Sequence, residues 1–417
     1  MPAGRTADDD APGRFSAWRE RHLFGDRPPY GLILIAFVVI SVVLTAAVTI
    51  AGKSTALPAV LSGPAWLDSW FGFDAGWYYR IATEGYSYTP DGQSSIAFFP
   101  TYPVLVHLLG SLIGDYQIAG TIIAVAGGMV AVCLFAAWVW PRLPRPAAVV
   151  AVAFMMLYPY SFFLYGPMYS DSTFLVAVFG SFLLLERRLY WLAGLVGILA
   201  TAGRPVGIAV TIGLVVRMLE LRARDRQDLE QSDSRGGERR ITFGQLVQAI
   251  PTVRWREMGV LVSGLGLAGW CAYLWIVFGD PLIWIEAQAA WGQGSGPSTW
   301  FKLQYFDTLF HGGPWWKWAL TGQLIMCGIA VAMLPAVRRR FGLGYLFYAV
   351  TTLAIPLIGT KDFYGVGRYV LAAFPVVAAG SVWLVESHRR WVIPLLVASA
   401  LGMVFCACLF AMGLPVS

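Results

Sequence analysis

An acidic side chain, Asp74, lies in the most aromatic part of the sequence. Twelve of the forty residues in 64–103 are aromatic, and Asp74 stands beside Phe73, Trp77 and Tyr78. A carboxylate shielded by rings loses solvation, which raises its proton affinity and suits a general base. Aromatic faces with polar edges also suit a sugar, whose C–H faces are apolar and whose rim carries hydroxyl groups. The pattern indicates activation of a hydroxyl group, with Trp77 and Tyr78 lining the substrate site.

The aromatic residues have a second interpretation. Tryptophan and tyrosine gather at membrane–water interfaces, and such a belt would account for the rings without any chemistry. A belt needs no carboxylate among its rings, so Asp74 is the residue that it leaves unexplained.

Apolar helices must position these side chains. Hydrophobic residues make up 57% of the 417-residue chain and charged residues only 13%, about half the usual share of a soluble domain. The apolar runs are continuous and do not alternate, which favours helices over a membrane barrel. We expect an all-α integral membrane protein with about eleven transmembrane helices, near 31–52, 117–138, 147–164, 172–186, 189–202, 205–219, 258–278, 316–335, 343–358, 369–386 and 392–412. The first of these follows about thirty polar residues and is predicted to be a permanent anchor.

Basic residues predict the orientation. With the N-terminus in the cytoplasm, 23 of the 30 lysines and arginines fall in cytoplasmic segments, as the positive-inside rule requires. The short apolar stretch 97–113 is then an interfacial or re-entrant helix on the outer face. The run 189–219 becomes two short helices bent at Gly203-Arg204-Pro205, which places Arg204 toward the outer side.

This topology divides the chain into four parts. We expect a cytoplasmic tail (1–30), a catalytic membrane module (31–219) with the outer loop 53–116, a charged cytoplasmic linker (220–257), and a C-terminal membrane module (258–417) with the outer loop 279–315.

Cofactor and nucleic-acid sites are not indicated. The five cysteines fall inside apolar stretches without ligand spacing, and the four histidines are scattered. We expect no cofactor, although a single carboxylate-bound divalent ion is compatible with the sequence. The net charge of +6 resides in short interhelical loops, where it serves orientation, so no nucleic-acid partner is expected.

Several motifs resemble those of one family. The string Asp74-Ala-Gly-Trp77-Tyr78, continued by Ile81-Ala82, Gly85-Tyr86 and Ala97-Phe98-Phe99-Pro100-x-Tyr102-Pro103, resembles the signature of PIG-V-type mannosyltransferases. These are membrane glycosyltransferases of the GT-C type that use polyprenyl-phosphate sugars. Later elements that look like the family's, in the same order, are Tyr169-Ser170-Asp171, Arg204-x-x-Gly207, Gly279-Asp280-Pro281 with Trp291, and Arg368-Tyr369 through Pro375. One departure is Phe73, where the family usually has tryptophan.

The resemblance implies a reaction. Asp74 would take the proton from an acceptor hydroxyl as its oxygen attacks the anomeric carbon of a mannosyl group, with inversion and without a covalent intermediate. The donor would be a polyprenyl-phosphate sugar, and the acceptor a lipid, glycan or protein. The active site would lie on the extracytoplasmic face of the cell membrane.

The resemblance also implies further site residues. Arg204 and Arg368 would stabilise the phosphate leaving group, with Lys361 and Arg80 as weaker candidates. For all four, an interfacial or snorkelling cation is the alternative. Tyr169, Asp171 and Tyr369 would line the sugar or acceptor pocket, although an acid such as Asp171 can equally serve a helix N-terminus.

Two other classes of protein remain as alternatives. A multi-spanning transporter or lipid flippase would need charged residues at the bilayer midplane and usually internal repeats, and the sequence shows neither. An intramembrane aspartyl protease would need two aspartates that face each other within membrane helices. Asp171 lies at the start of a predicted helix, and no second aspartate lies inside one.

Overall fold

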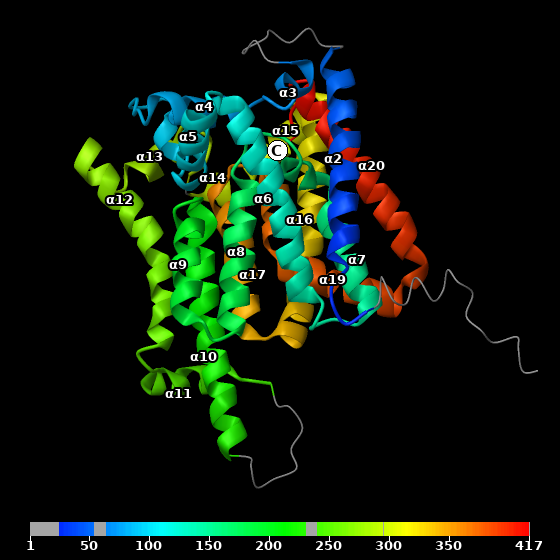
Figure 1. Cartoon of the computed structure of the whole chain (residues 1–417). Coiled ribbons are helices and arrows are strands. Elements are labelled where there is room, and N and C mark those ends of the chain that lie inside the picture. Colours follow the sequence, from blue (N-terminus) through cyan, green and yellow to red (C-terminus); the bar gives the residue numbers. More distant parts are fainter. Residues whose placement is uncertain (1–24, 54–63, 231–239, 295, 417) are drawn as a thin grey trace, which may run out of the picture.

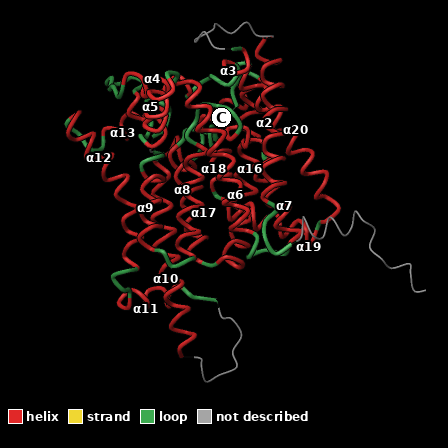
Figure 2. The backbone as a smooth tube through the Cα atoms, in the orientation of Figure 1, coloured by secondary structure: helices red, strands yellow, loops and turns green. Residues whose placement is uncertain are grey.

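A computed structural model describes residues 25–53, 64–230, 240–294 and 296–416. Over these residues the chain consists of helices and loops, and Figure 2 shows no strand among them. The helices are α2 (Tyr30–Lys53), α3 (Ala65–Asp68), α4 (Ala75–Glu84), α5 (Thr101–Ile113), α6 (Tyr116–Val139), α7 (Arg145–Leu157), α8 (Asp171–Glu186), α9 (Tyr190–Thr201), α10 (Ile208–Glu230), α11 (Phe243–Ala249), α12 (Leu265–Phe278), α13 (Ile283–Ala289), α14 (Pro297–Trp300), α15 (Leu303–His311), α16 (Pro314–Phe341), α17 (Leu343–Gly359), α18 (Val366–Ala372), α19 (Phe374–Ser387) and α20 (Val392–Ala411). Short 3₁₀ helices are η1 (Ser95–Ala97), η2 (Pro159–Leu164), η3 (Pro205–Gly207), η4 (Ile250–Thr252), η5 (Glu257–Gly264) and η6 (Arg389–Trp391). The predicted all-α membrane fold is confirmed.

Length and composition identify fewer candidate membrane spans in the described chain than the prediction counted. Five helical segments in the described chain are long and apolar enough to cross a bilayer: Tyr30–Gly52, Tyr116–Val139, Glu257–Phe278, Pro314–Phe341 and Arg389–Ala411. A sixth is added if α18 and α19, bent by 76°, count as one span. Helices such as α9, with 12 residues, are too short by themselves for a hydrocarbon core of about 30 Å. The predicted total of about eleven spans is not confirmed.

The helices run between two ends of the molecule (Figure 1). Helices α3, α4, α5 and α13 lie at one end, whereas α11 and the last turns of α10 lie at the other. The expected outer loops therefore lie opposite the charged segment after residue 217. Which end faces the cytoplasm stays a prediction.

Prolines account for several shifted helix ends. Helix α7 stops at Leu157 rather than continuing to 164, because Tyr158 precedes Pro159 and takes an extended conformation. The predicted helix 369–386 is broken at Ala373, and Pro375 opens the following helix α19. The apolar stretch 97–113 forms a helix only after Pro100, as α5.

The predicted linker 220–257 is partly helical. Helix α10 continues through its charged residues to Glu230, and α11 packs against it with Leu246 and Ala249 buried. A small apolar cluster that includes Ala223, Ile241 and Leu343 holds α11 in place. In the sequence these few apolar residues are scattered among arginines, so no packed helix was predicted there.

A charged cluster joins three helices and the α6–α7 loop at the α11 end. Arg217 pairs with Glu186 at 2.7 Å and with Glu220 at 3.0 Å, and Arg142 pairs with Glu186 at 3.1 Å. The hydroxyl group of Tyr345 donates to Glu186 at 2.8 Å. Pairing compensates for burial of these charges, so the cluster fixes the ends of α8, α10 and α17 relative to one another.

Candidate active site

Asp74 is the residue that precedes α4. Its backbone N–H donates to the hydroxyl oxygen of Tyr169 at 3.0 Å, which ties the start of α4 to the loop before α8. The carboxylate does not cap its own helix, so it is free to face other groups. Phe73, just before it, has a φ of 49°, a left-handed conformation that is uncommon for a residue with a bulky side chain. The turn that presents Asp74 thus combines an uncommon backbone conformation at Phe73 with a hydrogen bond from Asp74 to Tyr169.

The guanidinium of Arg368 lies between two carboxylates. Its Nη2 is 3.7 Å from Asp74 Oδ2, and its Nη1 is 3.6 Å from Asp171 Oδ2. The same group lies over the rings of Phe163 and Tyr169, with 5.0 and 5.3 Å between Cζ and the ring centroids. Arg368 therefore connects α18 with α4 and α8.

A second arginine completes the cluster. Arg204, in the bend between α9 and η3, donates from Nε to Ser170 Oγ at 3.0 Å and forms an ion pair with Asp171. Its guanidinium lies 5.9 Å from the ring centroid of Tyr369. Two arginines and two aspartates thus alternate within one buried cluster, and their charges balance.

Asp74 is the most accessible of the four charged groups. Its side chain is 27% exposed, against 15% for Arg368, 9% for Arg204 and 6% for Asp171. Burial raises the pKa of Asp74 above its usual value, while Arg368 and Arg204 oppose this rise and Asp171 adds to it. Asp74 is therefore the group that can both be reached and hold a proton more tightly than an ordinary aspartate.

Hydroxyl groups connect this cluster to α4. The hydroxyl of Tyr78 lies 2.8 Å from Ser170 Oγ, which also accepts from Arg204. Burial raises the pKa of Tyr78 to about 12, so the phenol stays protonated near neutral pH. Tyr78, Ser170 and Arg204 form a continuous hydrogen-bonded wall beside Asp74.

An uncharged aromatic wall lies on another side of α4. Trp77 stacks with Phe98 at a centroid distance of 5.9 Å, and Trp291 meets both rings edge-on at 5.3 Å. Gln288 Nε2 donates to the carbonyl of Ala97 at 2.8 Å and so holds the second outer loop against this wall. Trp77 follows Asp74 by three residues, so both belong to the same turn of the chain.

Two predicted cations lie apart from the cluster. Arg80 is exposed and pairs with Glu84 at 2.9 Å, one helical turn further along α4. Lys361 is exposed in the loop after α17, where its backbone N–H donates to the carbonyl of Gly292 at 3.2 Å. The structure brings together the other predicted site residues, with Trp77 on the aromatic wall: Asp74, Tyr78, Tyr169, Asp171, Arg204, Arg368 and Tyr369.

Sequence reasoning did not single out the ring that supports Arg368. Phe163 belongs to η2, where it also packs against Tyr169 at 4.7 Å. The aromatic density of residues 158–165 was a signal that could have led to it.

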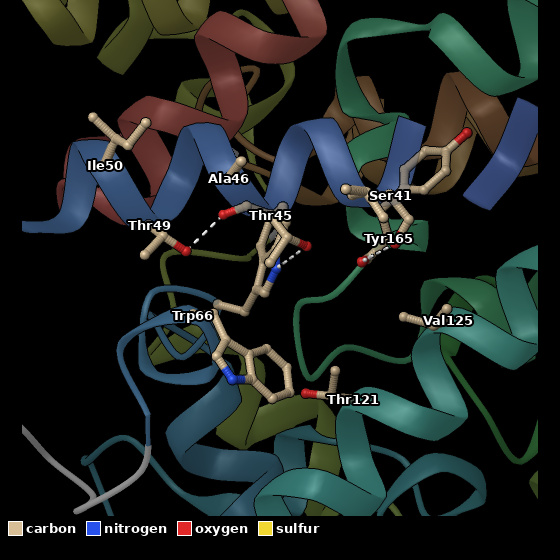
Figure 3. A pocket seen from close by; sticks show the side chains of 11 residues that line it. Ser41, Thr45, Ala46, Thr49, Ile50, Trp66, Thr121, Val125 and Tyr165 are labelled. Atoms are coloured by element: carbon tan, nitrogen blue, oxygen red, sulfur yellow. Dashed lines mark hydrogen bonds between the residues drawn. The ribbon is translucent and has the colours of Figure 1, made fainter. Parts of the chain in front are cut away.

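A groove runs along α2 (Figure 3). It encloses about 520 Å³ and is lined by α2 residues such as Ser41, Thr45 and Thr49, with Trp66 and Tyr165 on other elements. Trp70 in its wall donates from Nε1 to Thr45 Oγ1 at 3.2 Å. Trp70 precedes Asp74 by four residues and Tyr165 precedes Tyr169 by four, so two short segments lead from the groove to the carboxylate.

No metal centre is evident in the part of the chain that the structure describes. No three histidine, cysteine or acidic side chains gather there in a way that could hold an ion. Between Asp74 and Asp171 lies a guanidinium rather than a third acidic ligand.

Comparisons with known proteins returned structures but no sequence family. Neither protein-family models nor curated proteins match the chain. A structure of the Archaeoglobus fulgidus oligosaccharyltransferase in complex with Zn and sulfate aligns with a TM-score of 0.44 and 15% identity, over 91% of this chain and 53% of that one. The oligosaccharyltransferase AglB of Archaeoglobus fulgidus, in complex with an inhibitory peptide and a dolichol-phosphate, aligns with a TM-score of 0.44 and 14% identity, over 91% of this chain and 56% of that one. The chain spans about half the length of these proteins. The resemblance to PIG-V-type enzymes stays a prediction.

Proposed function

We propose that this protein is a membrane glycosyltransferase that moves mannose from a polyprenyl-phosphate donor to an acceptor hydroxyl, with inversion. The observation that carries the proposal is the accessible Asp74 carboxylate, which lies beside Arg368 in a cluster of two acids and two arginines. The motif resemblance around Asp74 and Arg368 supports the same assignment.

Asp74 acts as the general base in this reaction. A raised pKa strengthens its affinity for the acceptor proton, while its exposed fraction leaves room for the hydroxyl group. The acceptor oxygen forms a bond to the anomeric carbon as the bond to the phosphate oxygen breaks, and the proton passes to Asp74. The polyprenyl phosphate leaves with the bonding electrons.

Arg368 and Arg204 stabilise the phosphate as its negative charge develops. Both are held in place by Asp171, so little reorganisation is needed when the leaving group forms. Arg368 is the nearer to Asp74 and contacts the donor first. Asp171 is thus a positioning residue in this mechanism, and Tyr169 and Tyr369 flank the two guanidiniums.

The two substrates approach from different sides. The donor's isoprenoid tail lies in the groove along α2, whose lining residues Trp70 and Tyr165 are each four residues before a residue of the site, Asp74 and Tyr169. The acceptor lies against the uncharged wall of Trp77, Phe98 and Trp291, where rings suit the C–H face of a sugar. The acceptor is a lipid, glycan or protein, and the site faces the extracytoplasmic side.

The direct test is donor consumption. Purified protein in nanodiscs is incubated with a panel of polyprenyl-phosphate sugars (mannose, glucose, galactose and a pentose), and release of polyprenyl phosphate is measured. We expect the mannosyl donor to be consumed fastest. If another sugar is preferred, mannose specificity is wrong, and if none is consumed, the glycosyltransferase proposal itself fails.

A further inference from the structure

A basic pocket lies at the far end of α8 from the charged cluster. Helix α8 begins at Asp171 and has 16 residues, so its two ends are about 24 Å apart. The pocket encloses about 640 Å³ between the α8–α9 loop, α10 and the segment that leads into η5. It is therefore separate from the site around Asp74.

Arginines dominate the lining of this pocket. Arg188, Arg222, Arg254 and Arg256 contribute four positive charges, and only two acids, Asp225 and Glu257, offset them. The pocket thus carries an excess of two positive charges. Guanidinium groups bind phosphates through paired hydrogen bonds, so this excess suits an anionic phosphate ligand.

Two of the arginines have acidic partners and two do not. Arg188 makes two hydrogen bonds to Asp225, at 2.7 and 3.0 Å, and Arg222 lies 3.8 Å from Glu257. By contrast, Arg254 and Arg256 are exposed, and within the described residues neither side chain has an ion pair or hydrogen bond. The acids thus hold one side of the pocket rigid and leave two guanidiniums for a ligand.

The pocket opens beside an apolar surface. Trp191 belongs to its lining and meets Trp255 at a centroid distance of 5.7 Å, an arrangement typical of the membrane–water boundary. Further along the same helices, Leu192, Leu195 and Leu261 are 49, 51 and 49% exposed. A charged pocket that continues into an apolar stripe matches a ligand with a charged head and hydrocarbon tails.

We infer that this pocket binds an anionic phospholipid of the adjacent leaflet. The phosphate contacts Arg254 and Arg256, and the acyl chains lie along the exposed leucines of α9 and η5. Basic pockets between membrane helices bind lipid head groups in this way. The lipid would hold η5 against α9, where Gly194 and Gly259 already allow close backbone contact.

Native mass spectrometry of delipidated protein in a neutral detergent tests this inference. The protein is titrated with phosphatidylglycerol, with zwitterionic phosphatidylcholine, and with glycerol 3-phosphate as the free head group. Phosphatidylglycerol should bind more tightly than phosphatidylcholine, and glycerol 3-phosphate should bind weakly, because it lacks the chains. Equal binding of the two lipids would overturn the proposal, and tight binding of glycerol 3-phosphate would replace it with a soluble phosphate site.

Charge-matched variants locate the site. R254Q/R256Q should weaken phosphatidylglycerol binding about 25-fold, roughly fivefold for each charge removed. R338Q/R339Q removes two exposed charges from the end of α16, outside the pocket, and should leave the affinity for the tightest-bound lipid unchanged. Equal losses in both variants would show a general charge effect and contradict a defined pocket. These measurements do not depend on glycosyl transfer, so their failure is distinguishable from failure of the proposed function.

Discussion

Arg368 Nη2 lies 3.7 Å from Asp74 Oδ2, so the proposed base and the proposed phosphate-binding cation form an ion pair. This pairing affects both the pKa and the orientation of Asp74. The guanidinium opposes the rise in the pKa of Asp74 that burial causes, and it keeps the carboxylate oriented in the absence of substrate. A donor phosphate that draws Arg368 toward itself would leave Asp74 a stronger base at the moment the acceptor needs one.

The pH dependence of transfer should report this pair. Asp74 works only when deprotonated, and its pKa is raised, so kcat/KM should fall on acidification at a higher pH than an ordinary aspartate would allow. R368Q removes a charge that favours the ionised carboxylate, so the acidic limb should move further toward higher pH. R80Q removes an exposed arginine paired with Glu84 and should leave the limb in place. A limb that stays fixed or moves to lower pH in R368Q would contradict the pairing.

Arg204 should matter for both stability and donor use. In R204M the buried Asp171 loses its closest partner, and the free energy of unfolding should fall by about 3–5 kcal/mol. D171N/R204M removes both charges of the pair and should recover much of the melting temperature. The double variant should still show a raised KM for the donor, because the phosphate lacks its second cation. A double variant with wild-type donor kinetics would remove Arg204 from phosphate binding.

The hydroxyl of Tyr169 should affect turnover rather than binding. Its oxygen accepts the backbone N–H of Asp74, and Y169F leaves that group unpaired at the turn that presents the carboxylate. At about 1 kcal/mol for one hydrogen bond, kcat should fall roughly fivefold with little change in KM. Y79F is the matched control, since Tyr79 packs edge-on against Phe71 and Tyr116 away from Asp74. Equal effects of the two variants would point to a general packing defect.

The orientation can be tested with two single cysteines. G244C lies on α11 and D280C in the second outer loop, and both positions are exposed at opposite ends of the molecule. In intact cells a membrane-impermeant maleimide should label D280C but not G244C, and both should react after permeabilisation. The reverse pattern would place Asp74 on the cytoplasmic side and exclude the proposed orientation.

The sequence alone placed Asp74 among aromatic side chains. Asp74, Trp77 and Tyr78 lie within one short segment, so their proximity follows from the chain itself. The contact between Asp74 and Arg368 joins α4 to α18, which are far apart in the sequence. Residue type and position alone could therefore only list Arg368 as one candidate among four.

The positions of Arg80 and Lys361 outside the cluster have physical explanations. Arg80 and Glu84 are four residues apart on a helix, a spacing that favours an ion pair, and this pair keeps Arg80 at the surface. Lys361 lies in a loop whose backbone pairs with residues near Gly292, and no hydrophobic pattern predicts such an isolated bridge. The predicted span count is not confirmed, because apolar runs in the sequence mark apolar helices without showing which of them are long enough to cross a bilayer.

The most direct test of the mechanism is glycosyl transfer by D74N in nanodiscs, with the wild-type protein and D68N measured alongside. Asparagine keeps the size of the side chain but cannot accept the acceptor's proton, and Asp68 lies six residues earlier, where its Oδ1 accepts from Gln117. We predict that D74N loses at least about a hundredfold in kcat at an unchanged melting temperature, while D68N keeps most of its activity. Transfer by D74N within a few fold of the wild-type rate would contradict the role of Asp74 as general base.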